Sequence, residues 1–145
     1  MNYLLFCFLQ LFGISHNAPW LYDFEKAKAQ AGESHKFILL NFSGSDWCIP
    51  CIKMDTQFFE NAGFIEFAED HLVLLKADFP RLKKNALESD QLKRNEKMVE
   101  RYNPDGIFPF TVLLNTEGKT LLTMEGLPKG NVNDFILQIT ETINQ

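Results

Sequence analysis

The feature that most restricts the fold is a pair of cysteines placed where an apolar run ends and a helical pattern begins. Residues 37–42 read FILLNF, a nearly continuous apolar run typical of a strand that is buried on both faces. A Ser-Gly-Ser segment at 43–45 ends the run, and Cys48 and Cys51 follow it. Apolar residues then recur at steps of three and four, as they do in a helix. This order of strand, tight loop and helix predicts a fold of the α/β class.

The residues after the cysteines complete a strand-helix-strand unit. Residues 62–70 predict a short helix, and Leu72–Asp78 reads LVLLKAD, which predicts a second buried strand. Two strands joined by a helix within one sheet run parallel, with a right-handed crossover between them. We therefore expect the strands over 37–42 and 72–78 to be parallel.

Two further helices are expected on either side of this unit. Apolar residues at helical spacing over 21–31 predict a first helix of about three turns, which Gly32 closes. Another helix is expected over 89–102, with Ser89 as its N-cap and Leu92 among its inward residues.

The C-terminal third predicts a hairpin followed by a last helix. Strands over 110–114 and 119–124 flank the sequence Asn-Thr-Glu-Gly at 115–118, a hairpin signal with glycine at the tight position. The last helix begins near Asn131. The expected architecture is one domain with a central mixed sheet flanked by helices. The sheet combines the parallel strand-helix-strand unit with a C-terminal antiparallel hairpin.

The first eighteen residues differ from the rest of the chain. Twelve of them are apolar and none is Lys, Arg, Asp or Glu. This is typical of the core of a signal peptide, and it is too short for a membrane span, which takes about 20 apolar residues. We predict that residues 1–18 form a signal peptide, so Cys7 is removed with it on cleavage. The domain over 19–145 would then be periplasmic or otherwise extracytoplasmic, without a permanent membrane anchor. Since no Lys or Arg precedes the apolar run, a buried N-terminal helix or strand is the alternative.

Composition excludes two classes of protein. The net charge of -5, from 14 basic and 19 acidic side chains, offers no attraction for a polyanion, so no nucleic-acid partner is expected. Three cysteines are too few for a small disulfide-stapled scaffold, whereas fourteen phenylalanines can supply a core. Any function of the cysteines therefore lies in the chemistry of one site and not in holding the whole fold together.

The spacing of Cys48 and Cys51 suits thiol-disulfide exchange. Two intervening residues place both sulfurs on one helical turn, and the helix N-terminus offers unpaired N–H groups and a partial positive charge to the first sulfur. We predict that Cys48 is the acidic, exposed nucleophile and that Cys51, one turn inside the helix, resolves the mixed disulfide. Pro50 takes an early helical position without losing a hydrogen bond and stiffens the turn.

Two structural roles for the cysteine pair remain as alternatives. A zinc site needs about four ligands, and beyond the pair the chain offers only three histidines, with no second pair at finger spacing. A structural disulfide across two residues removes little entropy from the unfolded chain. We expect neither a metal nor another cofactor.

The sequence over about 20–145 resembles the thioredoxin superfamily. The resemblance rests on W-C-x-P-C at 47–51, the buried strands around it, Gly-Ile-Phe-Pro at 106–109 before a hairpin, and the closing helix. The stretch FSGSDWCIPC at 42–51 is most similar to extracytoplasmic thioredoxin-like proteins of Bacteroidetes-type bacteria. The resemblance implies a thioredoxin-like fold.

The resemblance also implies a substrate-binding surface beside the cysteines. It implies that Pro109 is cis and faces the cysteine turn, and that the backbone of Phe108 pairs with an extended substrate peptide. The substrate-binding residues that it implies are Trp47, Ile49, Pro50, Phe108 and Pro109. The alternatives are plain core packing for Trp47 and an ordinary strand start for the Phe-Pro-Phe segment.

Several positions depart from the family pattern, among them Asn41 and Ile49. Asn41 falls opposite the family's buried aspartate if the Ser-Gly loop carries one extra residue. Because an amide cannot take a proton, deprotonation of Cys51 would then use water or another group, such as Asp46. Ile49 replaces the glycine of the reducing thioredoxins and changes the contact surface.

Residues 81–101 hold seven of the fourteen basic side chains. Such a run is usually the solvated face of a helix and loop. The alternative is a docking patch for an acidic redox partner.

Two functions follow from these observations. The first is an exported thiol-disulfide oxidoreductase, reductase or isomerase in direction, that exchanges disulfides with protein or peptide substrates through Cys48 and Cys51. In an oxidising compartment it would need a membrane protein as electron donor or acceptor. The second is a redox-inert binding or chaperone-like module of the same fold. A third interpretation, a cytoplasmic thioredoxin, requires an uncleaved N-terminus.

Overall fold

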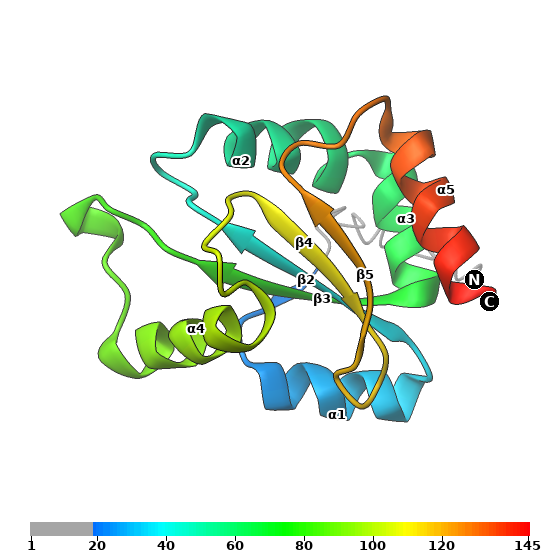
Figure 1. The fold of residues 1–145 in the computed structure, drawn as a ribbon, viewed down its shortest axis with the longest axis horizontal. Helices are drawn as coiled ribbons and strands as arrows, with labels where there is room; N and C mark the ends of the chain where they lie inside the picture. Colours follow the sequence, from blue (N-terminus) through cyan, green and yellow to red (C-terminus); the bar gives the residue numbers. More distant parts are fainter. Residues whose placement is uncertain (1–18) are drawn as a thin grey trace, which may run out of the picture.

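The computed structural model describes residues 19–145, so the predicted signal peptide and Cys7 lie outside the described residues. A five-stranded mixed sheet runs through the molecule in the order β1-β3-β2-β4-β5 (Figure 1). Its strands are β1 (Trp20–Leu21), β2 (Phe37–Ser43), β3 (Leu72–Asp78), β4 (Phe110–Leu114) and β5 (Thr120–Glu125). β1 and β2 run parallel to β3, whereas β4 is antiparallel to both β2 and β5. The predicted parallel unit and C-terminal hairpin are therefore confirmed.

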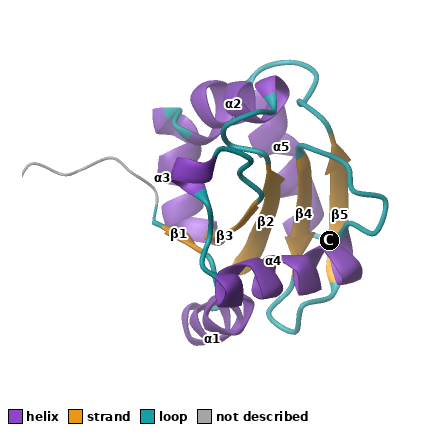
Figure 2. Ribbon diagram, turned by 90° about the vertical axis from the view of Figure 1, so that its left-hand side faces the viewer, coloured by secondary structure: helices purple, strands orange, loops and turns teal. Residues whose placement is uncertain are grey.

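Helices cover both faces of the sheet (Figure 2). They are α1 (Phe24–Ser34), α2 (Ile49–Met54), α3 (Ala62–His71), α4 (Ser89–Tyr102) and α5 (Val132–Ile143). A π-helical turn, η1 (Asp55–Phe59), continues α2, and a 3₁₀ turn, η2 (Lys83–Asn85), lies between β3 and α4. α1 and α4 pack on one face, and α2, α3 and α5 pack on the other. Within residues 19–145, no helix is long and apolar enough to span a bilayer.

The central strand β2 shows why its sequence is nearly all apolar. Ile38, Leu40 and Phe42 enter the core beneath α1 and α4, whereas Leu39 enters the core beneath α2, α3 and α5. Since successive side chains of a strand point to opposite faces, a strand covered on both faces needs apolar residues at successive positions. Asn41 interrupts this run.

The first helix differs from the prediction at both ends. Leu21 belongs to β1, where it pairs with Leu75, and α1 begins only at Phe24. The carboxylate of Asp23 accepts a hydrogen bond from the Lys26 amide and so caps the helix, which is a stronger start signal than the apolar spacing. α1 also continues past Gly32 to Ser34.

The bounds of α4 match the prediction, but its N-cap and the position of Leu92 do not. Glu88, and not Ser89, holds the N-cap position, without a side-chain hydrogen bond. Leu92 is exposed, whereas Asn95 and Met98 are buried. The Asn95 amide donates to the backbone carbonyl of Asp78 at 2.8 Å. The inward face of α4 thus combines this polar contact with Val99 and Tyr102, which pack against the core.

The helix that follows the cysteines continues as a π-helical turn beyond its α-helical residues. The π turn η1 places two consecutive side chains, Phe58 and Phe59, in the core beneath α3 and α5. Asp55, the first residue of the turn, forms an ion pair with Lys76 of β3 at 2.6 Å. This bulge is not visible in the three- and four-residue spacing.

Candidate active site

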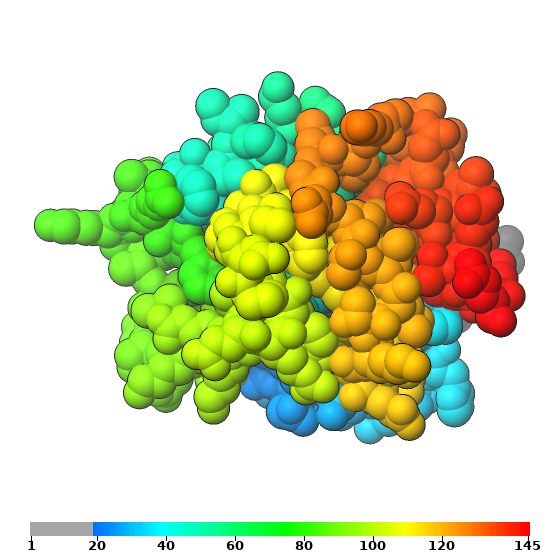
Figure 3. Space-filling view, viewed as in Figure 1, coloured from blue at the N-terminus to red at the C-terminus, as the bar shows by residue number. Residues whose placement is uncertain are grey.

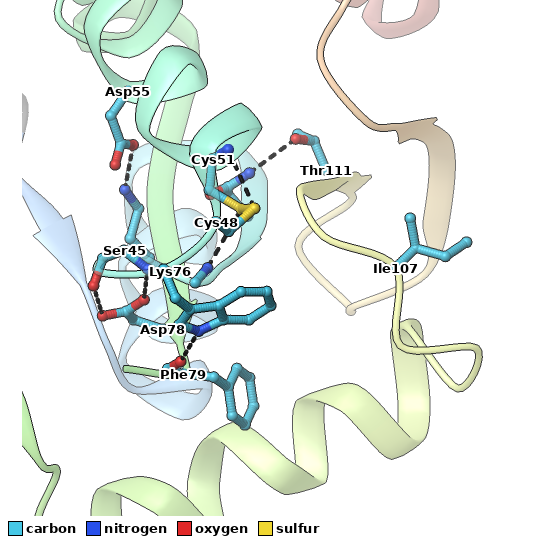
Figure 4. The surroundings of a disulfide bond; sticks show 12 residues. Ser45, Cys48, Cys51, Asp55, Lys76, Asp78, Phe79, Ile107 and Thr111 are labelled. Atoms are coloured by element: carbon cyan, nitrogen blue, oxygen red, sulfur yellow. Dashed lines mark hydrogen bonds and ion pairs between the residues drawn. A yellow bond between two sulfur atoms is a disulfide. The ribbon is translucent and has the colours of Figure 1, made fainter. Parts of the chain in front are cut away.

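Cys48 and Cys51 are joined by a disulfide at the start of α2, beyond the carboxyl end of β2 (Figure 4). Their Cα atoms are 5.2 Å apart. Cys48 is the N-cap residue, and its sulfur accepts a hydrogen bond from the Cys51 amide at 3.3 Å. The Gly44 amide donates to the sulfur of Cys51 at 3.4 Å. Backbone N–H groups therefore face both sulfurs.

Cys48 is more exposed than Cys51, as predicted, but it is much less exposed than predicted. Cys51 is 1% exposed and Cys48 is 6% exposed, so the expectation of an exposed Cys48 is wrong for this disulfide form. The sulfur of Cys48 turns back over the first helical turn, toward the Cys51 amide, and away from solvent.

The two residues between the cysteines are exposed. Pro50 lies in the first turn of α2, as predicted, where a missing N–H costs no intrahelical bond. Ile49 is the first residue of α2, and 66% of its surface is exposed. An apolar side chain is thus presented to solvent beside the disulfide.

Trp47 is held on three sides. Its indole N–H donates to the Phe79 carbonyl at 2.7 Å, and its ring meets that of Phe108 edge-on at 5.8 Å between centroids. The Arg81 guanidinium lies 3.6 Å from the ring centroid. A Cβ at Gly44 would overlap the indole, so the glycine is required there by close approach. Three segments of the chain therefore meet around the Trp47 indole ring.

The peptide bond between Phe108 and Pro109 is cis, as the resemblance implied. Pro109 is buried, and its carbonyl accepts a hydrogen bond from the Gly126 amide at 2.8 Å. The loop before it carries Ile107 on the side of the disulfide that faces β4 (Figure 4). That Phe108 and Pro109 bind a substrate peptide stays a prediction.

Asn41 is buried beneath α2, and its amide donates to the Thr111 hydroxyl of β4 at 3.1 Å. Asp46, named above as an alternative to water for the deprotonation of Cys51, makes its hydrogen bonds to another loop. Its carboxylate accepts hydrogen bonds from the Arg81 and Leu82 amides at 2.9 and 3.0 Å and from the Asn85 side chain at 3.0 Å. These bonds, that of the Arg81 amide above all, lower the pKa of Asp46 below its ordinary value of 3.8.

A second carboxylate, Asp78 at the end of β3, holds the other part of the cysteine loop. It accepts hydrogen bonds from the Ser45 amide and the Ser45 hydroxyl. Sequence reasoning missed the close approach of Trp47 at Gly44. It also missed the hydrogen bonds by which Asp46 and Asp78 hold the two loops, because their partners lie more than thirty residues away. The one local signal was the small, polar composition of the segment before Trp47.

Among residues 19–145, no group of three or more His, Cys, Asp or Glu side chains is arranged to hold a metal ion. The histidines considered as zinc ligands, His35 and His71, lie at the ends of α1 and α3.

Known proteins resemble this chain in sequence and in fold. The disulfide bond reductase DsbH of Chlamydia pneumoniae is 37% identical over 114 residues, which cover 79% of this chain and 66% of that protein. The thioredoxin-related protein DsbJ of the same organism is 24% identical over 135 residues, 88% of this chain and 37% of DsbJ. The chain therefore spans less than two thirds of either relative's length. A solved structure of a DsbH oxidoreductase has a TM-score of 0.79 at 33% identity, covering 88% of this chain and 85% of that one.

Residues 19–116 match the family model described as thioredoxin-like. The match includes β1 to β4 and both cysteines. This chain therefore belongs to the thioredoxin-like family.

Proposed function

We propose that this protein is a thiol-disulfide oxidoreductase that exchanges disulfides with protein or peptide substrates through Cys48 and Cys51. The observation that carries the proposal is the disulfide at the first turn of α2, where backbone amides face both sulfurs. A hydrogen-bond donor that faces a sulfur in the oxidised form also faces the thiolate after reduction. Such donors and the helix N-terminus stabilise a thiolate, which is the reactive form.

The reaction needs only the two sulfurs and a substrate disulfide. In the reduced protein the Cys48 thiolate attacks one substrate sulfur, which forms a mixed disulfide and releases the first substrate thiolate. Cys51 loses its proton to solvent, and its thiolate attacks the Cys48 sulfur. The mixed disulfide breaks, the second substrate thiolate leaves, and two electrons have passed to the substrate. The protein is left with the Cys48–Cys51 disulfide.

A surface around the disulfide suits an extended substrate. Ile49 and Pro50 are exposed, and Trp47 and Phe108 are half-buried in contact with each other. We assign substrate contact to these four residues and to Pro109, whose cis bond shapes the loop after Phe108.

The relatives support the direction of a reductase, because one is named a disulfide bond reductase and is 37% identical. The proposal extends to an extracytoplasmic location, with 1–18 as a cleaved signal peptide, and to a membrane protein that supplies the electrons. The twelve apolar residues among the first eighteen, with no Lys, Arg, Asp or Glu, support the location.

Turnover of insulin with dithiothreitol as reductant tests the activity of the protein over 19–145. We expect wild type to accelerate insulin reduction and Cys48→Ser to abolish the acceleration. Cys51→Ser is the matched variant: it retains the attacking sulfur and should accumulate a mixed disulfide, visible as added mass. If wild type does not accelerate the reduction and Cys51→Ser forms no adduct, the oxidoreductase proposal is wrong and the alternative, a redox-inert binding module, takes its place.

The reduction potential of the pair, measured by equilibration with glutathione, tests the direction. A value near about -270 mV is expected for a reductase, whereas one near about -120 mV would make the protein an oxidant.

A further inference from the structure

The loop between β3 and α4 carries a concentrated positive charge next to the active site. Residues 79–87 read FPRLKKNAL, with three cations, Arg81, Lys83 and Lys84, and no acidic residue, in a chain whose net charge is -5. All three cations are exposed, and Leu82 between them is 47% exposed. We call residues 79–87 the basic loop. Figure 3 shows this green segment projecting from the body of the molecule, on the side where the cyan cysteine loop lies.

The basic loop is tied to the residues that immediately precede Cys48. Asp46 accepts hydrogen bonds from the Arg81 and Leu82 amides and from the Asn85 side chain. Trp47 donates to the Phe79 carbonyl, and Arg81 lies over the indole ring. Because neighbouring residues anchor both the loop and the nucleophile, the position of the loop relative to Cys48 is set by the fold.

The helix that begins at the disulfide, α2, adds exposed apolar and basic side chains to this side of the active site. Ile49 and Ile52 of α2 are 66% and 42% exposed, and Lys53 of the same helix is exposed. Asp46 and Asp78, which hold the loops on either side of Trp47, remain negative, but both are half-buried and accept hydrogen bonds from those loops. The exposed charges of the basic loop and at Lys53 are therefore all positive.

We propose that the basic loop selects substrates: it docks an extended, disulfide-bearing segment of another protein that carries acidic side chains next to its cysteine. Complementary charge across an exposed surface acts mainly on the rate of encounter and on the choice of partner. The selection should therefore appear in kcat/KM and weaken as salt is added. This inference rests on the proposed oxidoreductase activity.

Three synthetic peptides test the selection. They share one intramolecular disulfide and differ only at the two positions beside one cysteine, which are both Glu, both Gln or both Lys. At low salt we expect kcat/KM of wild type to be about fivefold higher for the Glu peptide than for the Gln peptide, and lowest for the Lys peptide. At about 1 M salt the three values should converge. Equal values at low salt would overturn the proposal.

Two pairs of substitutions locate the effect. Lys83→Ala with Lys84→Ala should abolish the preference, and Lys83→Glu with Lys84→Glu should reverse it. The control is Lys26→Ala with Lys119→Ala, which also removes two exposed lysines. Lys119 follows the turn after β4, and β4 ends opposite the start of β2, away from Cys48. A preference that survives loss of Lys83 and Lys84 would contradict the assignment.

Reduction of uncharged hydroxyethyl disulfide separates this inference from the activity on which it rests. All variants should reduce it at the wild-type rate. Failure of wild type to reduce it would remove the proposed activity, whereas reduction without a preference among the peptides would overturn only the docking role.

Discussion

At the scale of single residues, Gly44 determines where the Trp47 indole can lie. A methyl group at position 44 would overlap the ring atoms of Trp47, so Gly44→Ala must displace the indole from Phe79 and Arg81. We expect Gly44→Ala to lower the free energy of unfolding by about 1–3 kcal/mol, the usual cost of overpacking. Urea unfolding measures this loss, and insulin reduction should fall with it.

Gly32→Ala is the matched control. Gly32 lies in α1, and nothing within 4 Å of its position would meet a Cβ. The substitution should raise the free energy of unfolding by about 0.5–1 kcal/mol, because alanine has the higher helix propensity. If both substitutions have the same effect, close approach to Trp47 is not the constraint at Gly44.

Asn41 and Thr111 form a buried polar pair between β2 and β4. Both are 1% exposed, and the amide donates to the hydroxyl. Thr111→Val keeps the shape but leaves the amide without its acceptor, so we expect it to cost about 1–3 kcal/mol of unfolding free energy. Asn41→Leu combined with Thr111→Val removes both polar groups and should cost less than the sum of the single substitutions. Additive costs in urea unfolding would show that the pair is not coupled.

At the scale of elements, Asp46 couples the cysteine loop to the basic loop. Its hydrogen bonds lower its pKa below the ordinary value of 3.8, so the folded protein favours the carboxylate more than the unfolded chain does. The resulting stabilisation is present above pH 3.8 and is lost as the pH falls through the lower, folded pKa. The loop contact should thus persist through neutral and mildly acidic pH.

Amide chemical shifts measure this contact directly. We expect the Arg81 and Leu82 amide resonances to stay constant from neutral pH down to the ordinary carboxyl value of 3.8 and to move only below it. In Asp46→Asn that transition should be absent. A transition at higher pH in wild type would mean that the bonds do not stabilise the carboxylate.

Elements whose pattern is set by burial could be predicted from sequence. β2 and β3 lie inside the sheet with helices on both faces, which leaves a continuous apolar run in each. β1 could not be predicted, because two residues carry no periodicity and its pairing with β3 joins positions more than fifty residues apart. The burial of Asn95 in α4 was missed because its partner, the Asp78 carbonyl, lies seventeen residues away at the end of β3.

At the scale of the whole molecule, some features of the active site could also be predicted from sequence and others could not. The cysteine pair, Pro50 and the cis bond before Pro109 were predicted, since short motifs carry them. The contacts of Asp46 were not, because its hydrogen bonds join it to residues 35 to 39 positions further along the chain. The same separation along the chain explains why sequence alone could not place the basic run over 81–101 relative to the cysteines.

The proposed domain over 19–145 depends on β1, the first element that the structure describes. β1 pairs with β3 at Leu74 and Leu75 and so completes that edge of the sheet. Trp20 packs edge-on against Phe59 at 4.9 Å, and the Lys76 amine lies 4.5 Å from a Trp20 ring centroid. A boundary placed after β1 would open the edge of β3 and uncover this cluster.

Comparison of a chain that starts at Pro19 with one that starts at Asp23 tests this boundary. Loss of Trp20 and of the edge pairing should lower the free energy of unfolding by about 3–5 kcal/mol, the range for removal of a packed tryptophan. An open strand edge also favours association between chains, so the shorter protein should form oligomers on gel filtration. Trp20→Ala in the longer chain is the control: it removes the ring but keeps the strand, and should be destabilised while remaining monodisperse. Equal stability of the two chains in urea would place the domain boundary after β1.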